Sequence, residues 1–180
     1  GVDEVGRGCL AGPVVAAAVS FPLNHTVIVG INDSKQLTPV KREELDLAIR
    51  AQAKGIGIGQ VSAIVIDKIG IISATKLAMH RACANLDHQI ILVDGPSTLD
   101  LDKLCIHGQA IIKGDTKIYS IAAASIVAKV FRDKLITKLA LKYSQYLWQD
   151  NKGYGTKAHI EAILAYGLTP LHRKSFTVRQ

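Results

Sequence analysis

We expect this 180-residue chain to fold as a single α/β domain, and three observations predict that class. The chain has the length of one ordinary domain, and 48% of its residues are apolar, which is enough to build a core. Strand-like and helix-like segments alternate along it. No internal repeat, low-complexity run or long linker divides it, so one domain over residues 1–180 is the simplest organisation.

The first third of the chain predicts two strands and one helix. Residues 13–21 (PVVAAAVSF) are nearly all apolar and predict a buried strand. A helix is expected from Pro39 to about residue 53, because Thr38 can cap its first turn and proline is favoured at its first position. Residues 55–61 (GIGIGQV) alternate glycine with larger residues, which predicts a strand whose backbone another element approaches closely.

The next two predicted elements are a helix and a strand that ends in an acidic residue. Residues 73–86 predict a helix, and residues 89–94 (QIILVD) predict a short buried strand that ends in Asp94. Ligand crevices of α/β sheets lie outside the carboxyl ends of the strands. Asp94 is therefore better placed for chemistry than most acids of the chain.

Two helices are predicted in the last third. A long one is expected over residues 120–143 and a shorter one over residues 157–165, followed by Gly167 and a basic tail over residues 168–180. The apolar face of the long helix is expected to comprise Ala124, Val127, Ala128, Phe131, Leu135 and Leu139, with Lys129, Arg132, Asp133 and Lys134 on other faces.

The net charge of +7 is unevenly distributed. Residues 1–102 contain 9 basic and 11 acidic side chains, whereas residues 103–180 contain 13 basic and 4 acidic ones. An excess of Lys and Arg of this kind favours a polyanionic partner such as nucleic acid. A solvated basic surface without a partner explains the same counts, so charge alone leaves the question open.

Membrane and disulfide chemistry are not expected. The longest apolar stretch, residues 10–23, is interrupted by glycine, proline and serine and is too short for a membrane span. Cys9, Cys83 and Cys105 are odd in number and fit no zinc-ribbon spacing. With no secretory signal in the sequence, we expect a reducing, cytoplasmic location.

Four carboxylates form the strongest candidate site: Asp3, Glu4, Asp94 and Asp115. Adjacent residues of a strand point to opposite faces, so Asp3 and Glu4 serve one site only if the backbone turns, or if one acts through its carbonyl or a water. Oxygen ligands without Cys or His partners suit Mg²⁺ or Mn²⁺. In a basic protein, two such ions about 3.5–4 Å apart could promote hydrolysis of a phosphodiester.

Three further features could bind nucleic acid. Gly6-Arg7-Gly8 follows the first acids, and glycines there let the backbone approach a sugar–phosphate chain closely. Tyr154 lies between glycines and near lysines, which suits stacking on a base or sugar. Lys35 could contact a phosphate. Each has an ordinary structural explanation when taken alone, as a tight turn, a loop tyrosine or an exposed lysine.

Together these motifs resemble those of one family. The chain resembles ribonuclease HII, the type 2 ribonuclease H, over essentially its whole length and in the family's order. The matching segments are residues 1–8 (GVDEVGRG), 10–15 (LAGPVV), 33–37 (DSKQL), 93–95 (VDG), 113–115 (KGD), 120–130 (SIAAASIVAKV), 132–133 (RD), 153–156 (GYGT) and 172–176 (HRKSF).

The resemblance implies a fold and an activity. The fold is ribonuclease H-like, with helices flanking a central mixed sheet and a small C-terminal helical part, about residues 144–180, that helps to hold the substrate. The activity is that of an endonuclease that cuts the RNA strand of RNA–DNA hybrids. It also incises duplex DNA on the 5′ side of a single embedded ribonucleotide, leaving 3′-hydroxyl and 5′-phosphate ends. We expect a monomer that uses two Mn²⁺ or Mg²⁺ ions per site.

The resemblance also implies residue roles. The metal-binding catalytic carboxylates are Asp3, Glu4, Asp94 and Asp115. The segment that reads the ribose 2′-hydroxyl, largely through backbone contacts, is Gly6, Arg7 and Gly8. Tyr154 is expected to stack at the junction between ribonucleotide and deoxyribonucleotide, and Lys35 is a further candidate for substrate binding. The 2′-hydroxyl is the group that distinguishes RNA from DNA at a given position.

Two residues, Asp133 and Cys9, bear on how closely the chain follows the family pattern. Asp133 is a second candidate for the fourth carboxylate, but its Arg-Asp setting on a long helix is more typical of an ion pair, so Asp115 is preferred. Cys9 stands where the family commonly has proline, and we expect little effect beyond local backbone stiffness.

A non-catalytic nucleic-acid-binding module and another nuclease of the same fold remain as alternatives. Metal-dependent turnover would distinguish the first, and incision at a single ribonucleotide the second.

Overall fold

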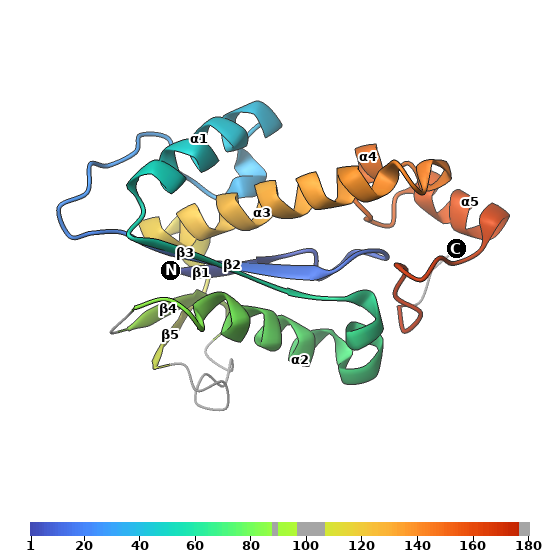
Figure 1. Ribbon diagram of the computed structural model, residues 1–180, viewed down its shortest axis with the longest axis horizontal. Coiled ribbons are helices and arrows are strands. Elements are labelled where there is room, and N and C mark those ends of the chain that lie inside the picture. The colour runs from blue at the N-terminus through green and yellow to red at the C-terminus, as the bar shows by residue number, and fades with distance from the viewer. Residues whose placement is uncertain (88–89, 97–106, 177–180) are drawn as a thin grey trace.

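The computed structural model describes residues 1–87, 90–96 and 107–176, and a five-stranded mixed sheet lies at its centre (Figure 1). The strand order is β3-β2-β1-β4-β5. Strands β1, β4 and β5 are parallel, whereas β2 is antiparallel to both β1 and β3. The strands are β1 (Val2–Val5), β2 (Val14–Ser20), β3 (Gly55–Val61), β4 (Ile91–Asp94) and β5 (Gly108–Ile111).

The register of the parallel strands brings acids to one edge of the sheet. Val2 of β1 pairs with Val93 of β4, so the next residues, Asp3 and Asp94, lie side by side. Asp94 in turn pairs with Ile111, the last residue of β5. The carboxyl ends of three neighbouring strands therefore meet where the predicted carboxylates lie.

Helices cover both faces of the sheet (Figure 1). Helices α1 (Pro39–Gln52) and α3 (Tyr119–Ala140) pack on one face, and α2 (Ala63–Cys83) packs on the other. Beyond the end of α3 lie α4 (Trp148–Asn151) and α5 (Lys157–Tyr166). Short 3-10 turns are η1 (Ser34–Gln36), η3 (Gly114–Thr116) and η4 (Ser144–Tyr146). No helix in the described part of the chain is long and apolar enough to cross a membrane.

The sequence features that predicted α1 and β3 are seen at work in the structure. Helix α1 begins at Pro39, and the Thr38 side chain accepts a hydrogen bond from the Lys41 backbone, as a cap does. The glycines of β3 are approached closely, as predicted. A Cβ at Gly57 or Gly59 would meet the carbonyl of Ala82 or Ala78 on α2, so only glycine lets this helix lie against the strand.

Other elements differ from the prediction. Helix α2 begins at Ala63, ten residues earlier than expected, and is interrupted at Gly70, whose φ of 77° lets the chain kink. Strand β5 was not predicted, because its four residues begin with glycine and lack a clear apolar run. The predicted strand over residues 89–94 is observed from Ile91, and residue 89 lies outside the described residues.

The buried face of α3 is also rotated from the predicted one. Arg132, expected outside the apolar face, is 0% exposed, whereas Phe131, Leu135 and Leu139 are only partly buried. Besides Val130, the buried residues of α3 from position 128 onward recur every four positions: Ala128, Arg132, Ile136 and Ala140. An arginine occupies this face because backbone carbonyls from other segments accept hydrogen bonds from its guanidinium.

The C-terminal helical segments pack against the end of α3. Tyr146, Trp148, Ala162 and Ile163 form one apolar cluster with Ile136 and Ala140 of α3 and with Ala11 of the N-terminal loop. This cluster joins the last part of the chain to the loop that follows β1. The described part of the predicted basic tail, residues 168–176, runs back to that loop, where Arg173 donates from its backbone to Leu10.

Candidate active site

A pocket of about 660 Å³ lies at the edge where β1, β4 and β5 end. It is lined by Glu4 at the end of β1, Asp94 at the end of β4 and Asp115 in the turn after β5. Arg7 and Lys35 contribute positive charge to the same pocket. Five residues predicted from the sequence to belong to one site thus share one cavity.

Asp3 is buried beside this pocket, with 6% of its surface exposed. Its Oδ1 accepts a hydrogen bond of 2.7 Å from the Glu4 backbone. Burial raises the pKa of Asp3 well above its usual value, and the charges of Glu4, Asp94 and Asp115 raise it further. Asp3 is therefore close enough to interact with all three acids, although it does not line the pocket with them.

Mutual repulsion also affects the acids that line the pocket. Burial raises the pKa of Glu4, against the effect of Arg7, whose Nη1 lies 3.4 Å from Glu4 Oε1. Burial and the Asp94 charge raise the pKa of Asp115, against the effect of Lys35, whose Nζ lies 3.8 Å from Asp115 Oδ2. The cluster thus holds more negative charge than its own two basic residues compensate.

Asp94 is fixed by the backbone of the turn that carries Asp115. The Gly114 N–H donates to Asp94 Oδ1 at 2.7 Å. A side chain at Gly114 would meet Ile121 and approach Asp94 Oδ1. Glycine at this position therefore lets the two acids lie in adjoining segments of the pocket wall.

The donor set fits a hard divalent cation. It consists of carboxylate oxygens, which Mg²⁺ and Mn²⁺ prefer, and a cation would favour the charged forms of these acids, whose pKa values burial and mutual repulsion raise. Among the residues that the structure describes, no three Asp, Glu, His or Cys side chains already form a group that could hold one ion. The carboxylates would therefore have to draw together when a cation binds.

The glycine-rich loop after β1 is held by Arg173, which is 2% exposed. Its Nη1 donates to the Arg7 carbonyl at 2.7 Å, and its Nη2 donates to the Gly6 carbonyl at 2.7 Å. Nε and Nη2 also donate to the Gly12 carbonyl at 3.1 and 3.0 Å. One guanidinium thus joins both ends of the loop.

Arg132 holds the far end of the same loop. Its Nη2 and Nε donate to the carbonyls of Ala11 and Pro13, each at 3.0 Å, and its Nη1 donates to the Lys152 carbonyl at 2.8 Å. A Cβ at Gly6, where φ is 88°, would collide with the Arg132 side chain. Gly6 is therefore required both by its conformation and by this contact, whereas a Cβ at Gly8 would meet no neighbouring atom.

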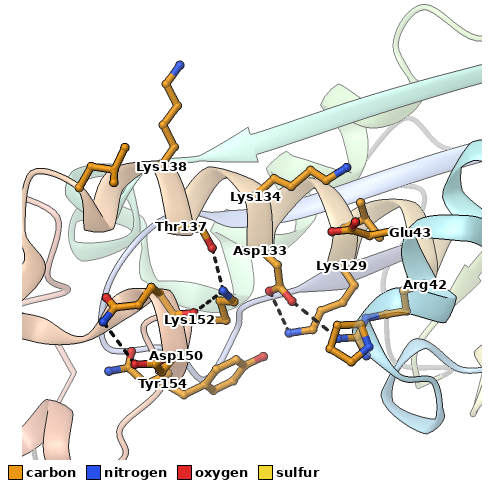
Figure 2. A pocket seen from close by; sticks show the side chains of 15 residues that line it. Arg42, Glu43, Lys129, Asp133, Lys134, Thr137, Lys138, Asp150, Lys152 and Tyr154 are labelled. Carbon is orange, nitrogen blue, oxygen red and sulfur yellow. Dashed lines mark hydrogen bonds and ion pairs between the residues drawn. The ribbon is translucent and has the colours of Figure 1, made fainter.

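Tyr154 lines a second groove and not the carboxylate pocket (Figure 2). Its ring is partly exposed, and Lys129 Nζ lies 5.6 Å from the ring centroid. Burial raises the pKa of Tyr154 to about 12, so its phenol is neutral at pH 7. The Cys9 thiol donates to the Lys152 carbonyl at 3.9 Å, which is a contact beyond the stiffness effect expected at Cys9.

The backbone of Tyr154 is held by a chain of buried side chains. Trp148 Nε1 donates to His159 Nε2 at 2.9 Å, so His159 carries its proton on Nδ1 and donates it to the Tyr154 carbonyl at 2.8 Å. The Thr169 N–H donates to His172 Nδ1 at 2.9 Å, which leaves His172 Nε2 to donate to His159 Nε2 at 3.2 Å. Both histidines are neutral in this arrangement.

Sequence reasoning assigned no role to Arg132, Arg173, His159 or His172. The four-residue spacing of Arg132 with Ala128 and Ile136 was the one signal that could have placed it on the buried face. Arg173 and His172 lie in a segment without helical or strand periodicity, so nothing in their spacing indicated burial.

The rejected alternative, Asp133, forms ion pairs away from the carboxylate pocket. Lys129 Nζ lies 2.9 Å from its Oδ1, and Arg42 Nη2 lies 3.9 Å from its Oδ2. The prediction of an ion pair was right, although its partners are not the neighbouring Arg132. This arrangement favours Asp115 as the fourth carboxylate.

Comparison with known proteins agrees with the resemblance seen in the sequence. The family model described as Ribonuclease HII matches residues 1–179. A ribonuclease HII of Wolbachia pipientis is 52% identical and is matched over 98% of this chain and 88% of its own length. The ribonuclease HII of Acetivibrio thermocellus is 51% identical, over 98% of this chain and 68% of its own length.

A solved structure supports the fold. The ribonuclease HII in a complex with PCNA from Archaeoglobus fulgidus superposes with a TM-score of 0.82 at 27% identity, covering 100% of this chain and 96% of that one. The predicted ribonuclease H-like fold and the predicted ribonuclease H enzyme class are thereby confirmed, and the alternative of a non-catalytic binding module is not supported. This chain belongs to the ribonuclease HII family.

Proposed function

We propose that this protein is a metal-dependent endonuclease that cuts the RNA strand of RNA–DNA hybrids and incises duplex DNA 5′ to a single embedded ribonucleotide. The products would carry 3′-hydroxyl and 5′-phosphate ends. The observation that carries the proposal is the convergence of Glu4, Asp94 and Asp115 in one pocket, with Asp3 buried beside them. Membership of the ribonuclease HII family supports it.

In this proposal Asp3, Glu4, Asp94 and Asp115 hold two Mg²⁺ or Mn²⁺ ions. When bound, such ions would supply an activated water and offset the charge of the scissile phosphate, so that no covalent enzyme intermediate would be needed. The chain's own contribution is to place the ligands. The β1–β4 register sets Asp3 beside Asp94, and the Gly114 N–H fixes one Asp94 oxygen so that the other is free to bind.

Substrate recognition is assigned to Gly6, Arg7, Gly8, Lys35 and Tyr154. The backbone of the glycine segment would contact the ribose 2′-hydroxyl, and the hydrogen bonds from Arg173 support this because they hold the segment in one conformation. Lys35 would contact a phosphate at the carboxylate pocket, which it lines. Tyr154 would stack on the nucleotide at the junction.

The remaining predictions concern the setting of the activity. We propose that the C-terminal helical part, about residues 144–180, helps to hold the duplex, and that the protein acts as a monomer in the cytoplasm. The substrate would be an RNA–DNA hybrid or a DNA duplex that contains ribonucleotides.

The experiment that tests the proposal is incision of an end-labelled DNA duplex that carries one ribonucleotide. The reaction is run with Mg²⁺, with Mn²⁺ and with a chelator, beside an all-DNA duplex of the same sequence. We expect metal-dependent cutting 5′ to the ribonucleotide and an intact control. Cutting of the all-DNA duplex would favour another nuclease of the same fold, and no cutting by folded protein would refute the proposal.

A further inference from the structure

Asp67, near the start of α2, contacts a turn of the C-terminal segment more than a hundred residues further along the chain (Figure 1). Its Oδ2 accepts a hydrogen bond from the Lys174 N–H at 3.0 Å. Its Oδ1 accepts one from the Ser175 N–H at 2.9 Å and one from the Ser175 hydroxyl at 2.6 Å. A single carboxylate therefore receives two backbone donors and one side-chain donor of the same turn.

These hydrogen bonds favour the charged form of the carboxylate. Burial acts to raise the pKa of Asp67, but the hydrogen bonds from Ser175 and Lys174 outweigh it and lower that pKa below its usual value. Lys174 and Ser175 are exposed, so water could serve their N–H groups as well. What the carboxylate adds is a fixed position for the turn, because it ties the turn to α2.

The turn held by Asp67 begins with Arg173. The Phe176 N–H donates to the Arg173 carbonyl at 3.1 Å and closes the turn over residues 173–176. On one side of the turn, the Arg173 guanidinium donates to the carbonyls of Gly6 and Arg7. On the other side, the Phe176 ring packs against the core cluster to which α2 contributes. The turn thus lies between α2 and the glycine-rich loop after β1.

We propose that Asp67 is a positioning residue for ribonucleotide recognition. It fixes the turn over residues 173–176, and the turn in turn sets Arg173 against the glycine-rich loop. The inference rests on the proposed function, in which that loop contacts the ribose 2′-hydroxyl. Asp67 does not line the carboxylate pocket, so it acts on the substrate through Arg173. A loop that adopts its binding conformation for only part of the time binds its ligand more weakly, and Asp67 prevents that loss.

Two simpler roles for Asp67 predict different results. If its charge alone mattered, removing the carboxylate would make the protein more basic and would strengthen its binding to a polyanionic duplex, which lowers KM. If Asp67 only stabilised the fold, its removal would reduce the fraction of folded enzyme, which lowers the apparent kcat and leaves KM unchanged. Loss of positioning raises KM with little change in kcat. The direction of the change in KM therefore distinguishes the three roles.

The test uses Asp67→Asn, which keeps the shape of the side chain but replaces one acceptor oxygen with an N–H donor. The matched control is Glu44→Gln, which makes the same change of charge at an exposed acid of α1 that is bonded to Lys41 and does not line the carboxylate pocket. Ser175→Ala removes the hydroxyl donor without a change of charge. The kcat and KM of each variant are measured on a duplex with one ribonucleotide, and urea unfolding verifies that each is folded.

We expect Asp67→Asn to raise KM about fivefold and Ser175→Ala to raise it about two- to threefold, each with kcat within about twofold of wild type. The control should have the wild-type KM or a lower one. In an Arg173→Met background, Asp67→Asn should change KM by less than about twofold, because the residue through which it acts is absent. If that double variant does not fold, the two single variants decide the question.

The two proposals fail in different ways. If the wild-type protein does not incise the ribonucleotide duplex at all, the proposed function is wrong, and the role of Asp67 falls with it. If it incises normally and the KM of Asp67→Asn is no higher than that of Glu44→Gln, the proposed function stands and the positioning role is wrong. An undiminished rise in KM in the Arg173→Met background would also overturn the proposal, because Asp67 would then act by another route.

Discussion

Replacing Arg173 with methionine should both destabilise the protein and loosen the glycine-rich loop after β1. Arg173 is buried and donates to the carbonyls of Gly6, Arg7 and Gly12. A buried carbonyl left without a partner costs about 1–3 kcal/mol, and methionine would remove the donor from three carbonyls, of which Gly6 keeps a longer bond of 3.4 Å from the Cys9 N–H. Arg7 is exposed, so water can replace one bond. Removing a buried charge, whose desolvation lowers the pKa of Arg173 to about 10, recovers part of the rest.

We therefore expect Arg173→Met to lower the free energy of unfolding by about 2–4 kcal/mol, out of a total of about 5–15 kcal/mol for a domain of this kind. Urea unfolding at pH 7 measures it, and the KM for a duplex with one ribonucleotide should rise in the same variant. Arg173→Lys is the matched control. It keeps the positive charge but not the planar fork, so it should recover only part of the loss. A loss below about 1 kcal/mol with an unchanged KM would refute the reasoning that this guanidinium holds the loop.

Three further predictions concern the histidine chain, the stacking residue and the sheet. Burial lowers the pKa of His172 to about 4. Between pH 6.5 and 4 the free energy of unfolding should therefore fall by up to about 3 kcal/mol relative to the non-titrating variant His172→Asn. Urea unfolding midpoints at several pH values measure this difference. Tyr154→Ala should slow cleavage at the junction by about five- to 150-fold, because stacking contributes about 1–3 kcal/mol per base. Gly57→Ala should cost about 2–4 kcal/mol in thermal unfolding, because its Cβ would meet the Ala82 carbonyl.

The sign of the pH effect follows from the lowered pKa. As the pH falls below about 6.5, an unfolded histidine takes up a proton while buried His172 does not, so stability is full above that pH and falls towards pH 4. The raised pKa values of Asp3, Glu4 and Asp115 act in the opposite direction. The informative quantity is therefore the difference between wild type and variant, and parallel pH curves would contradict the prediction.

The other two predictions have equally direct contrary results. Junction cleavage at the normal rate in Tyr154→Ala would remove Tyr154 from the proposed site. An unchanged unfolding temperature in Gly57→Ala would mean that α2 can move away from β3 without cost. Gly8→Ala is a useful comparison for the glycine, because a Cβ there meets no atom within 4 Å.

Local chemistry explains which parts of the fold were predictable. Thr38 and Pro39 define the start of α1 through their own hydrogen-bonding and backbone preferences, and the structure begins the helix there. Asp94 was placed correctly because a buried apolar run ending in an acid signals a strand end. The hydrophobic pattern did not predict β5 or the first ten residues of α2, because contacts with neighbouring elements, and not local preference, decide the conformation there.

The candidate site shows the same division. Residue chemistry and the family resemblance pointed to the carboxylates, and the structure brings them to one edge of the sheet. Arg132 was misplaced because a charged residue on a helix normally faces solvent. Two of its three acceptors, the carbonyls of Ala11 and Pro13, lie more than a hundred residues away in sequence, so no periodicity could indicate them. The chain from Thr169 to Tyr154 depends in the same way on contacts formed only in the folded protein.

The most direct test of the account is the variant Asp94→Asn, assayed for cleavage and for binding on the duplex with one ribonucleotide. Asparagine keeps the shape and can still accept the hydrogen bond from Gly114, but it removes the charge that would bind the metal ion. We predict that cleavage is abolished in both Mg²⁺ and Mn²⁺, while affinity for the duplex stays within about threefold of wild type, a change of under about 1 kcal/mol. Cleavage at the wild-type rate would contradict the assignment of this pocket as the active site.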